Sequence, residues 1–314
     1  MLDTIEISSD LKLRLTQIES MVGNTPLISI TRLHQNPRVK IFAKVEWEQL
    51  GGSVKSRPAF SIIKTAIENG YLDEDRHLLD ATSGNTGIAY AAIGAELGVP
   101  ITICLPENAS QERKELLWEY GANIFFTSRF ESTDGAQAKA RELKSTYPDK
   151  YFYADQYNNE ANWKAHFNNT AFEIFQQTDM KITHFVAGLG TTGTFVGTGR
   201  RLKQLNPNIQ LIALHPDTAL HGLEGWKHLE TARVPGIYDN KLADQDLLVD
   251  TLEAYEMIKL AKQKENLLLS PSSAANLAGA VKVVEQIEAG VIVTILPDNA
   301  DKYKEVTEQI WNSR

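Results

Sequence analysis

The sequence predicts an α/β fold with two open α/β domains, whose mostly parallel sheets are covered by helices. Short apolar runs alternate with longer helix-like stretches, which is typical of parallel sheets with helices on both faces. The 314 residues are enough for two such domains, and no internal repeat or low-complexity linker interrupts them. Three loops rich in Gly, Ser and Thr each follow a predicted strand, which is where open parallel sheets bind ligands.

Apolar spacing and turn residues place the elements in order along the chain. Amphipathic or alanine-rich stretches with plausible caps, such as Ser110, predict helices. These lie at 11–21, 58–69, 88–97, 110–120, 135–146, after 154 up to 177, and from 195 onwards. Short apolar runs bounded by turn residues predict strands. These lie at 28–33, 39–47, 77–81, 100–105, 123–127, 151–154, 184–187, 210–214, 267–269 and 291–296.

Composition argues against several classes of protein. The net charge of -8 disfavours a general nucleic-acid or anionic-membrane surface. No stretch approaches the roughly 18 apolar residues of a membrane span, and residues 1–6 lack the apolar region of an export signal. A single cysteine, Cys104, excludes an intrachain disulfide and fits a reducing, cytoplasmic setting. The histidines show no metal-binding spacing, so we expect no metal, and we expect His166 and His184 to serve packing or capping.

The loop Gly51–Arg57 holds the first candidate site residue, Lys55. The strand predicted at 39–47 leads into it, and a helical pattern begins at Pro58. A lysine beside a glycine pair and a helix start can form a Schiff base with a carbonyl, while nearby N–H groups hold an anion. An ordinary lysine on a surface loop is the alternative interpretation.

The second candidate loop is Thr82–Gly87, which opens a predicted helix. Its glycines let the backbone approach a ligand, and its hydroxyls, amide and helix-start N–H groups can bind a carboxylate or phosphate. A well-capped helix start would explain one Ser or Thr, but not this density of polar groups.

The third candidate loop is Gly188–Thr194, with three glycines and three threonines between a strand and a helix. This composition suits a phosphate monoester. Gly188, Gly190 and Gly193 also match the GxGxxG pattern of dinucleotide sites, and a flexible turn is a further alternative. A lysine, a carboxylate loop and a phosphate loop together suggest pyridoxal 5'-phosphate as cofactor.

With these three loops, the chain resembles the fold type II pyridoxal-phosphate enzymes and, within them, the cysteine synthases. The resemblance covers nearly the whole chain. It is carried, in order, by the segments Val22–Leu27, Ser53–Lys55, Thr82–Gly87, Leu105–Asn108 and Glu112–Leu117. Thr192, where A-type cysteine synthases usually have glycine, is similar to the B-type enzymes, as are Gly222–Lys227 and Val234–Pro235.

The resemblance implies a role for each candidate residue. Lys55 would form the internal aldimine and then act as general base at the substrate Cα. The remaining cofactor contacts would be Asn85 at the ring hydroxyl, Gly190, Thr191, Thr192, Gly193 and Thr194 at the phosphate, and Ser272 at the pyridine nitrogen. The substrate carboxylate would be held by Thr82, Ser83, Thr86 and Gln156. Lys227 lies where B-type relatives place arginine, and it could meet an anionic substrate.

The implied reaction is a β-replacement. An O-activated L-serine, either O-acetylserine or O-phosphoserine, would lose its β-substituent, and sulfide or thiosulfate would add to the resulting α-aminoacrylate to give L-cysteine. Cystathionine or diaminopropionate synthesis, or a catalytically weak regulatory paralogue, are the alternatives. The paralogue is suggested by departures from the family pattern at Gln49-Leu50 and Ser56.

We also predict a homodimer with a divided chain, because the loop Thr82–Gly87 falls within residues 48–156 and the loop Gly188–Thr194 falls outside them. Residues 1–47 and 157–314 would form a larger domain that binds the cofactor phosphate. Residues 48–156 would form a smaller substrate-binding domain carrying Lys55.

Overall fold

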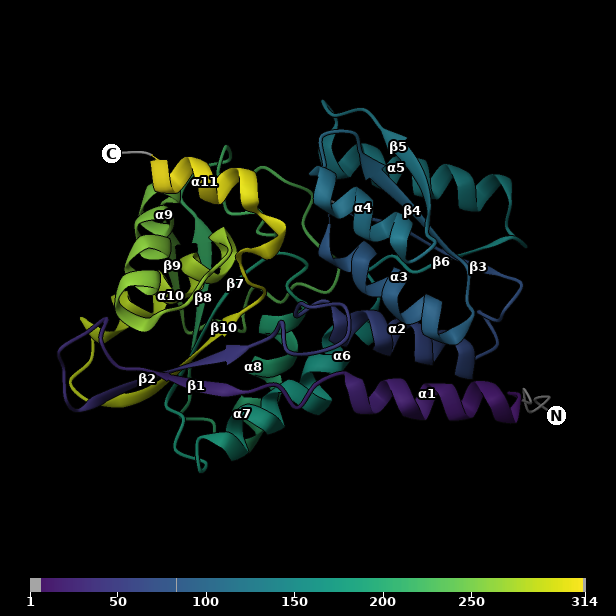
Figure 1. Ribbon diagram of the computed structural model, residues 1–314. Helices are drawn as coiled ribbons and strands as arrows, with labels where there is room; N and C mark the ends of the chain where they lie inside the picture. The colour runs from purple at the N-terminus through teal and green to yellow at the C-terminus, as the bar shows by residue number, and fades with distance from the viewer. Residues whose placement is uncertain (1–6, 83, 313–314) are drawn as a thin grey trace. The chain divides into compact units, whose positions relative to one another are not determined.

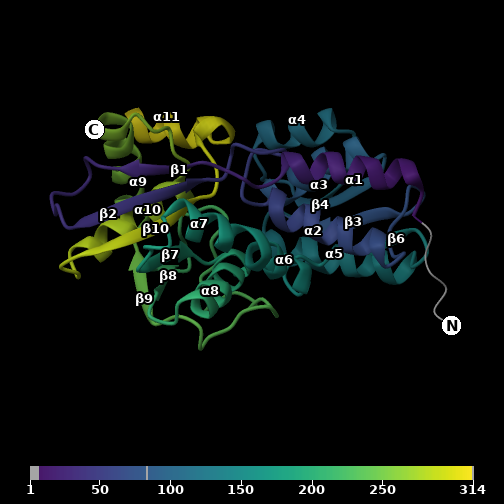
Figure 2. The same cartoon turned by 90° about the horizontal axis from the view of Figure 1, so that it is seen from below.

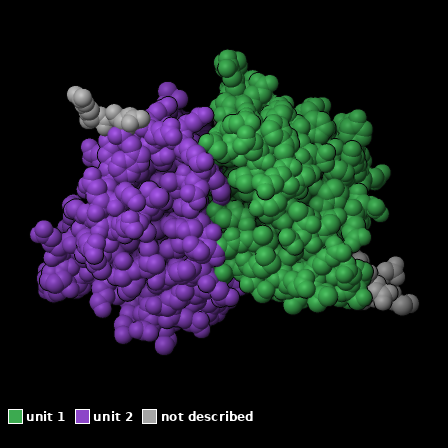
Figure 3. Space-filling view, in the orientation of Figure 1, with its two compact units in different colours: residues 1–23, 49–162 green, residues 24–48, 163–314 purple. Residues whose placement is uncertain are grey.

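The structure is a computed structural model that describes residues 7–82 and 84–312. The chain separates into two compact units (Figure 3). Unit 1 consists of Met1–Gly23 and Gln49–Asn162, and unit 2 consists of Asn24–Glu48 and Trp163–Arg314. Residues 1–6, expected to lack an export signal, and the candidate residue Ser83 lie outside the described residues. None of the helices in the described part of the chain is long and apolar enough to cross a membrane.

Unit 1 is built on a four-stranded parallel sheet with the order β5-β4-β3-β6. The strands are β3 (His77–Ala81), β4 (Ile101–Pro106), β5 (Asn123–Thr127) and β6 (Tyr151–Tyr153). Its helices are α1 (Ser9–Met21), α2 (Ser56–Glu68), α3 (Asn85–Leu97), α4 (Gln111–Glu119) and α5 (Ser132–Thr146). Helix α5 contacts all four strands from one side, and α3 lies on the other side (Figure 2).

The inner strands of unit 1, β3 and β4, are buried along almost their whole length because both faces of the sheet are covered. All six residues of β4 are buried. Helix α3 is almost entirely buried as well, since α1, α2 and α4 pack around it. Its alanines and glycines permit this, and a Cβ on Gly94 would lie 2.4 Å from a side-chain carbon of Ile101.

Unit 2 is built on a six-stranded sheet with the order β1-β2-β10-β7-β8-β9 (Figure 1). The strands are β1 (Leu27–Ile30), β2 (Val39–Val45), β7 (His184–Gly188), β8 (Gln210–Pro216), β9 (Gln245–Val249) and β10 (Gly290–Leu296). All neighbours run parallel except β1, which pairs antiparallel with β2. Helices α9 (Thr251–Leu260) and α10 (Pro271–Val284) pack together, with α10 against the sheet. The remaining helices are α7 (Ala171–Gln177), α8 (Gly193–Leu205) and α11 (Lys304–Asn312).

The chain passes from unit 1 to unit 2 within a helical stretch predicted to run up to 177. It comprises α6 (Glu160–Ala165), a π-helical turn at His166–Thr170 and α7. Helix α8 packs tightly on this turn, since a Cβ on Gly197 would lie 2.0 Å from the carbonyl oxygen of Trp163 and 2.8 Å from Cβ of His166. Such π-helical turns occur frequently at functional sites.

The mostly parallel α/β architecture predicted from the sequence is confirmed, with differences of detail. Helices α9, α10 and α11 were not predicted. The predicted strand at 267–269 is wrong: only Leu269 forms an isolated bridge, to Asn299, because the helix α10 begins two residues later. Strand β9 was not predicted, since three of its five residues are exposed and the run lacks a continuous apolar signal. Residues 7–23 belong to unit 1 rather than with unit 2, because Leu11, Leu15 and Ile18 pack into the core around α2 and α3.

Candidate active site

The lysine loop of unit 1 holds Lys55 at the start of helix α2. Lys55 is half-buried, between the fully buried Ser53 and Ser56, and its carbonyl already accepts the first helical hydrogen bond from Ala59 N–H at 3.0 Å. Gly51 and Gly52 have φ angles of +82° and +60°, a region that disfavours side chains. The glycine pair therefore makes the sharp turn that places a lysine at a helix N-terminus, as the sequence predicts.

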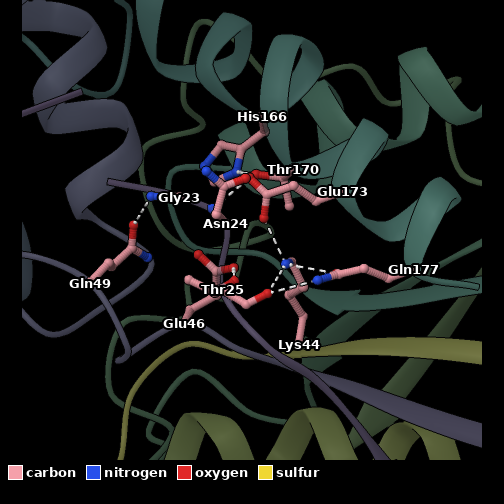
Figure 4. Close-up of polar contacts among 10 residues, drawn as sticks. All are labelled: Gly23, Asn24, Thr25, Lys44, Glu46, Gln49, His166, Thr170, Glu173 and Gln177. Carbon is pink, nitrogen blue, oxygen red and sulfur yellow. Dashed lines mark hydrogen bonds and ion pairs between the residues drawn. The ribbon is translucent and has the colours of Figure 1, made fainter. Parts of the chain in front are cut away.

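The departure from the family pattern at Gln49-Leu50 has a structural role in unit 1. Gln49 Oε1 accepts a hydrogen bond from Gly23 N–H at 2.9 Å (Figure 4), and Leu50 N–H donates to the carbonyl of Met21 at 3.0 Å. These bonds attach the lysine loop to the segment that follows α1. The side chain of Gln49 therefore helps to hold the start of the lysine loop.

The second candidate loop begins at Thr82, directly after the carboxyl end of β3 and next to the end of the parallel strand β6. Thr82 Oγ1 accepts from Gly84 N–H at 3.1 Å, which leaves its own hydrogen available to donate. Helix α3 begins at Asn85, and its first intrahelical bond runs from Ile88 N–H to Gly84 O at 3.2 Å. The N–H groups of the first turn thus lie at the positive end of a 13-residue helix, which favours an anion.

Gln156 joins this loop from the segment after β6. Its Nε2 donates to Ala81 O at 2.9 Å, and Thr86 Oγ1 donates to its Oε1 at 2.7 Å. Because a carbonyl only accepts, Ala81 fixes the orientation of the amide, so the Thr86 hydroxyl must be the donor. The second Nε2 hydrogen of Gln156 is then available for a ligand, whereas the hydrogen of Thr86 is already committed. The structure brings Thr82, Thr86 and Gln156 together, each at most 4% exposed.

The glycine-threonine loop of unit 2 leads from β7 into α8. A Cβ on Gly190 would lie 2.1 Å from the carbonyl oxygen of Gly225, and one on Gly188 would lie 2.0 Å from the ring of Trp226. Both positions therefore require glycine, because the neighbouring atoms are backbone or a buried indole. The backbone of this loop is held against the segment Gly222–Lys227, whose Lys227 N–H donates to Leu189 O at 2.8 Å.

Thr192 is the most informative residue of this loop. It is 3% exposed, and its Oγ1 is buried without a hydrogen-bond partner. Its φ of +70° is unusual for a β-branched residue and costs on the order of 1–2 kcal/mol. A strained residue with an unpaired buried hydroxyl, at the N-terminus of a 13-residue helix, fits a phosphate group that would accept this hydrogen bond.

Ser272 lies in the first turn of α10, near the carboxyl ends of the unit 2 strands β7 and β10. Its Oγ is 3.2 Å from Ser270 Oγ, and Ser273 Oγ donates to the carbonyl of Asp298, which follows β10, at 2.6 Å. From the same helix, Asn276 Oδ1 accepts from Gly188 N–H at 2.7 Å, which links α10 to the glycine-threonine loop. Ser272 is 5% exposed. The sequence analysis did not identify Asn276, although an Asn among the small and apolar residues of 274–281 was a visible signal.

His166 is buried, as its expected packing role requires, and it also contacts the glycine-threonine loop. Its Nδ1 is 3.0 Å from Thr170 Oγ1 and its Nε2 is 3.2 Å from Thr194 Oγ1. The ring is 1% exposed, so it orients the last threonine of the loop from inside unit 2. Among the described residues, no cluster of His, Cys, Asp and Glu could hold a metal ion.

A buried ion pair anchors the segment Asn24–Pro26 in unit 2 (Figure 4). Lys44, with a fully buried side chain, lies 2.6 Å from Glu173 and donates to Thr25 O at 2.5 Å and to Gln177 Oε1 at 3.0 Å. Glu173 Oε1 accepts in turn from Asn24 N–H at 3.0 Å. Thr25 also donates to the buried Glu46 at 2.8 Å. These contacts hold the backbone of Asn24 and Thr25 and pair the buried charge of Lys44, so the network has a structural role.

Comparisons with known proteins point the same way. The family described as "Pyridoxal-phosphate dependent enzyme" matches residues 18–298. The chain is 47% identical over 293 residues to a cysteine synthase of Aquifex aeolicus, covering 91% of this chain and 90% of that one. It is 35% identical to cysteine synthase B of Pseudomonas aeruginosa, covering 91% and 95%. The crystal structure of an O-acetylserine-dependent cystathionine β-synthase from Helicobacter pylori superposes with a TM-score of 0.86 at 29% identity, covering 92% of this chain and 91% of that one.

Proposed function

Because the chain belongs to the pyridoxal-phosphate-dependent enzyme family, we propose that it makes L-cysteine from an O-activated L-serine and sulfide. One observation carries the proposal beyond family membership. The glycine-threonine loop combines two glycines that exclude a Cβ with the strained, unpaired hydroxyl of Thr192. This arrangement suits a phosphate monoester and has no other partner for the buried hydroxyl in the described structure.

The residues present fit pyridoxal phosphate. The loop Gly190–Thr194 would hold its phosphate, Lys55 its aldehyde carbon, Asn85 its ring hydroxyl and Ser272 its pyridine nitrogen. A bound pyridoxal ring supplies an electron sink that acidifies the Cα–H bond of an amino acid. Ser272 is a hydroxyl rather than a carboxylate, so it cannot stabilise a full positive charge on that nitrogen, which favours early loss of the β-substituent.

The protein residues would bind the substrate and move its proton. Thr82 and the second amide hydrogen of Gln156 are the side-chain donors for the substrate carboxylate, helped by the first turn of α3. Thr86 acts indirectly, because its hydroxyl donates to Gln156 Oε1 and so holds that side chain in place. The amine of Lys55 removes the proton from Cα as general base. Burial of Thr82, Thr86 and Gln156 strengthens each of these hydrogen bonds by excluding water.

Lys227 would select the leaving group or the sulfur donor. Its backbone is fixed to the phosphate loop through Leu189, so its position is set even though its side chain is long. An ammonium group there would attract O-phosphoserine or thiosulfate more than neutral O-acetylserine. This would make the anionic substrates better ones for this enzyme.

Cystathionine formation is the second candidate function. It is favoured by the likeness to the O-acetylserine-dependent cystathionine β-synthase, whose fold and length this chain shares closely. The two functions use the same activated serine and differ only in the thiol that adds.

A substrate panel tests the proposal. The purified protein, loaded with pyridoxal phosphate, is given O-acetylserine or O-phosphoserine together with sulfide, thiosulfate or homocysteine, and the amino-acid products are identified by mass spectrometry. We expect L-cysteine with sulfide as the main product. Cystathionine formed faster than cysteine would favour the second function, and absence of every product with cofactor bound would indicate a regulatory paralogue.

The assembly and location of the protein belong to the same proposal. We propose a homodimer, which light scattering would report as twice the 35.0 kDa of one chain. The single cysteine favours the cytoplasm.

A further inference from the structure

Asp80, at the end of β3, is a buried acid to which the sequence gives no role. Its side chain has no exposed surface. Oδ1 accepts from Ala81 N–H at 2.8 Å, and Oδ2 accepts from Gln156 N–H at 3.3 Å. Asp80 forms no ion pair with any residue that the structure describes, and an unpaired carboxylate is costly to bury, so its retention calls for an explanation.

The hydrogen bonds of Asp80 close a ring around Gln156. Asp80 accepts from the backbone of Gln156, the Gln156 side chain donates to Ala81 O, and Ala81 N–H returns to Asp80. Asn162 holds the ring from outside, because its Nδ2 donates to Gln156 O at 2.7 Å. One carboxylate therefore joins the ends of two parallel strands and fixes both the backbone and the side chain of Gln156.

We propose that Asp80 is a positioning residue for substrate binding, which in its ionised form holds Gln156 in place to receive the α-carboxylate of the amino acid. The inference rests on the proposed function, since it presupposes that Gln156 meets that carboxylate. Protonated Asp80 accepts hydrogen bonds more weakly, and a proton on Oδ2 would oppose Gln156 N–H, donor against donor. The Gln156 amide would then lose one side of its support.

Five titratable groups of the described chain lie around Asp80. Those that act on it or are acted on by it are Tyr90 on α3, Cys104 on β4, Tyr153 on β6, and Asp155 and Tyr157 beyond β6. Burial raises the pKa of the Cys104 thiol to about 12 and raises the pKa of each of the three tyrosines. These four groups therefore stay protonated near neutral pH.

The other charged groups nearby come from α5 and the loop of Asp155. Asp134, Lys139, Arg141 and Glu142 of α5 act on Cys104, Tyr153 or Tyr157. Burial raises the pKa of Asp80 from 3.8 to about 7, the charge of Asp155 adds to this rise, and the hydrogen bonds from Ala81 N–H and Gln156 N–H oppose it. The switch between the two forms of Asp80 thus falls near neutral pH.

The test compares wild-type holoenzyme with Asp80→Asn, which keeps the shape of the side chain but cannot ionise. Binding of L-serine, which has the carboxylate but no activated leaving group, is measured by titration calorimetry between pH 6 and 8.5. We expect the affinity of the wild type relative to Asp80→Asn to fall about tenfold from pH 8 to pH 6, as the carboxylate protonates. Ethanolamine, which lacks the carboxylate, should show no such trend. A ratio independent of pH, or an equal trend for ethanolamine, would overturn the proposal.

Asp155→Asn provides a second variant, should Asp80→Asn fold poorly. Asp155 has a φ of +44°, which Asn tolerates, and its carboxylate accepts from Asn158 Nδ2 at 2.9 and 2.8 Å. Removing its charge should move the midpoint of the wild-type trend to lower pH and leave the affinity at pH 8.5 unchanged. An unmoved midpoint would refute the role of Asp80. Failure to bind cofactor at all would instead refute the proposed function, and normal cysteine synthesis with no pH trend in L-serine binding would refute only this inference.

Discussion

Replacing Thr192 by valine exchanges a buried hydroxyl for a methyl group and retains the shape and the positive φ of the residue. In the ligand-free protein the hydroxyl has no partner, so Thr192→Val should raise the free energy of unfolding by about 1–3 kcal/mol. With the cofactor phosphate present, the same hydroxyl would donate to an anion. Its loss should then weaken binding by about 1.5–3 kcal/mol, which is on the order of ten- to a hundredfold in Kd.

Thr198 offers a matched control on the same helix. It is fully buried, and its Oγ1 also lacks a hydrogen-bond partner, but it lies in the interior of α8 rather than in the loop. Thr198→Val should therefore stabilise the ligand-free protein by a similar amount and leave the Kd for pyridoxal phosphate unchanged. Denaturant titration of the ligand-free proteins and equilibrium dialysis with the cofactor measure the two effects. An unchanged Kd for Thr192→Val, or equal losses in both variants, would refute the reasoning that assigns the phosphate to this loop.

Three further perturbations have defined outcomes. Lys44→Met removes the cation that lies 2.6 Å from the 13%-exposed Glu173, so denaturant titration should show that the free energy of unfolding falls by about 3–5 kcal/mol. A fall of less than about 1 kcal/mol would contradict a structural ion pair. Between pH 4 and 8 the free energy of unfolding of the wild type, relative to that of Asp80→Asn, should fall by about 4 kcal/mol. The reason is that the folded state keeps the Asp80 proton up to a pKa of about 7, whereas the unfolded state releases it near 3.8. A difference in unfolding free energy that does not change with pH would count against the buried carboxylate. Lys227→Ala should raise KM for O-phosphoserine about ten- to a hundredfold and leave KM for O-acetylserine nearly unchanged, whereas equal changes would indicate a structural role for this lysine.

Much of the fold was predictable because its signals are local. The buried parallel strands read as short apolar runs, and each of the three polar loops follows one of them. Strand β9 lacks such a run, since it lies at the edge of the unit 2 sheet with residues such as Gln245 and Leu248 exposed. The segment 267–269 has an apolar run but only one partner residue, so it forms a bridge and no strand.

The candidate site was predictable in composition but not in its hydrogen bonds. Glycines and threonines mark the loops in the sequence, but only the structure shows that the Thr86 hydroxyl donates its hydrogen bond to Gln156. The sequence gives no sign that Gly190 faces the backbone of Gly225, 35 residues away, or that Asp80 reaches Gln156. These contacts depend on which chain segments the sheets bring together, and that information is not local.

In the proposed function, Lys55 is the residue that binds the cofactor aldehyde. The holoenzyme is treated with borohydride, which converts the bond between lysine and cofactor into a stable secondary amine, and the protein is digested and mapped by mass spectrometry. The account predicts a single modified peptide, carrying the label on Lys55, and a folded Lys55→Ala protein that takes up no label. A label on any other lysine, or equal labelling of Lys55→Ala, would contradict it.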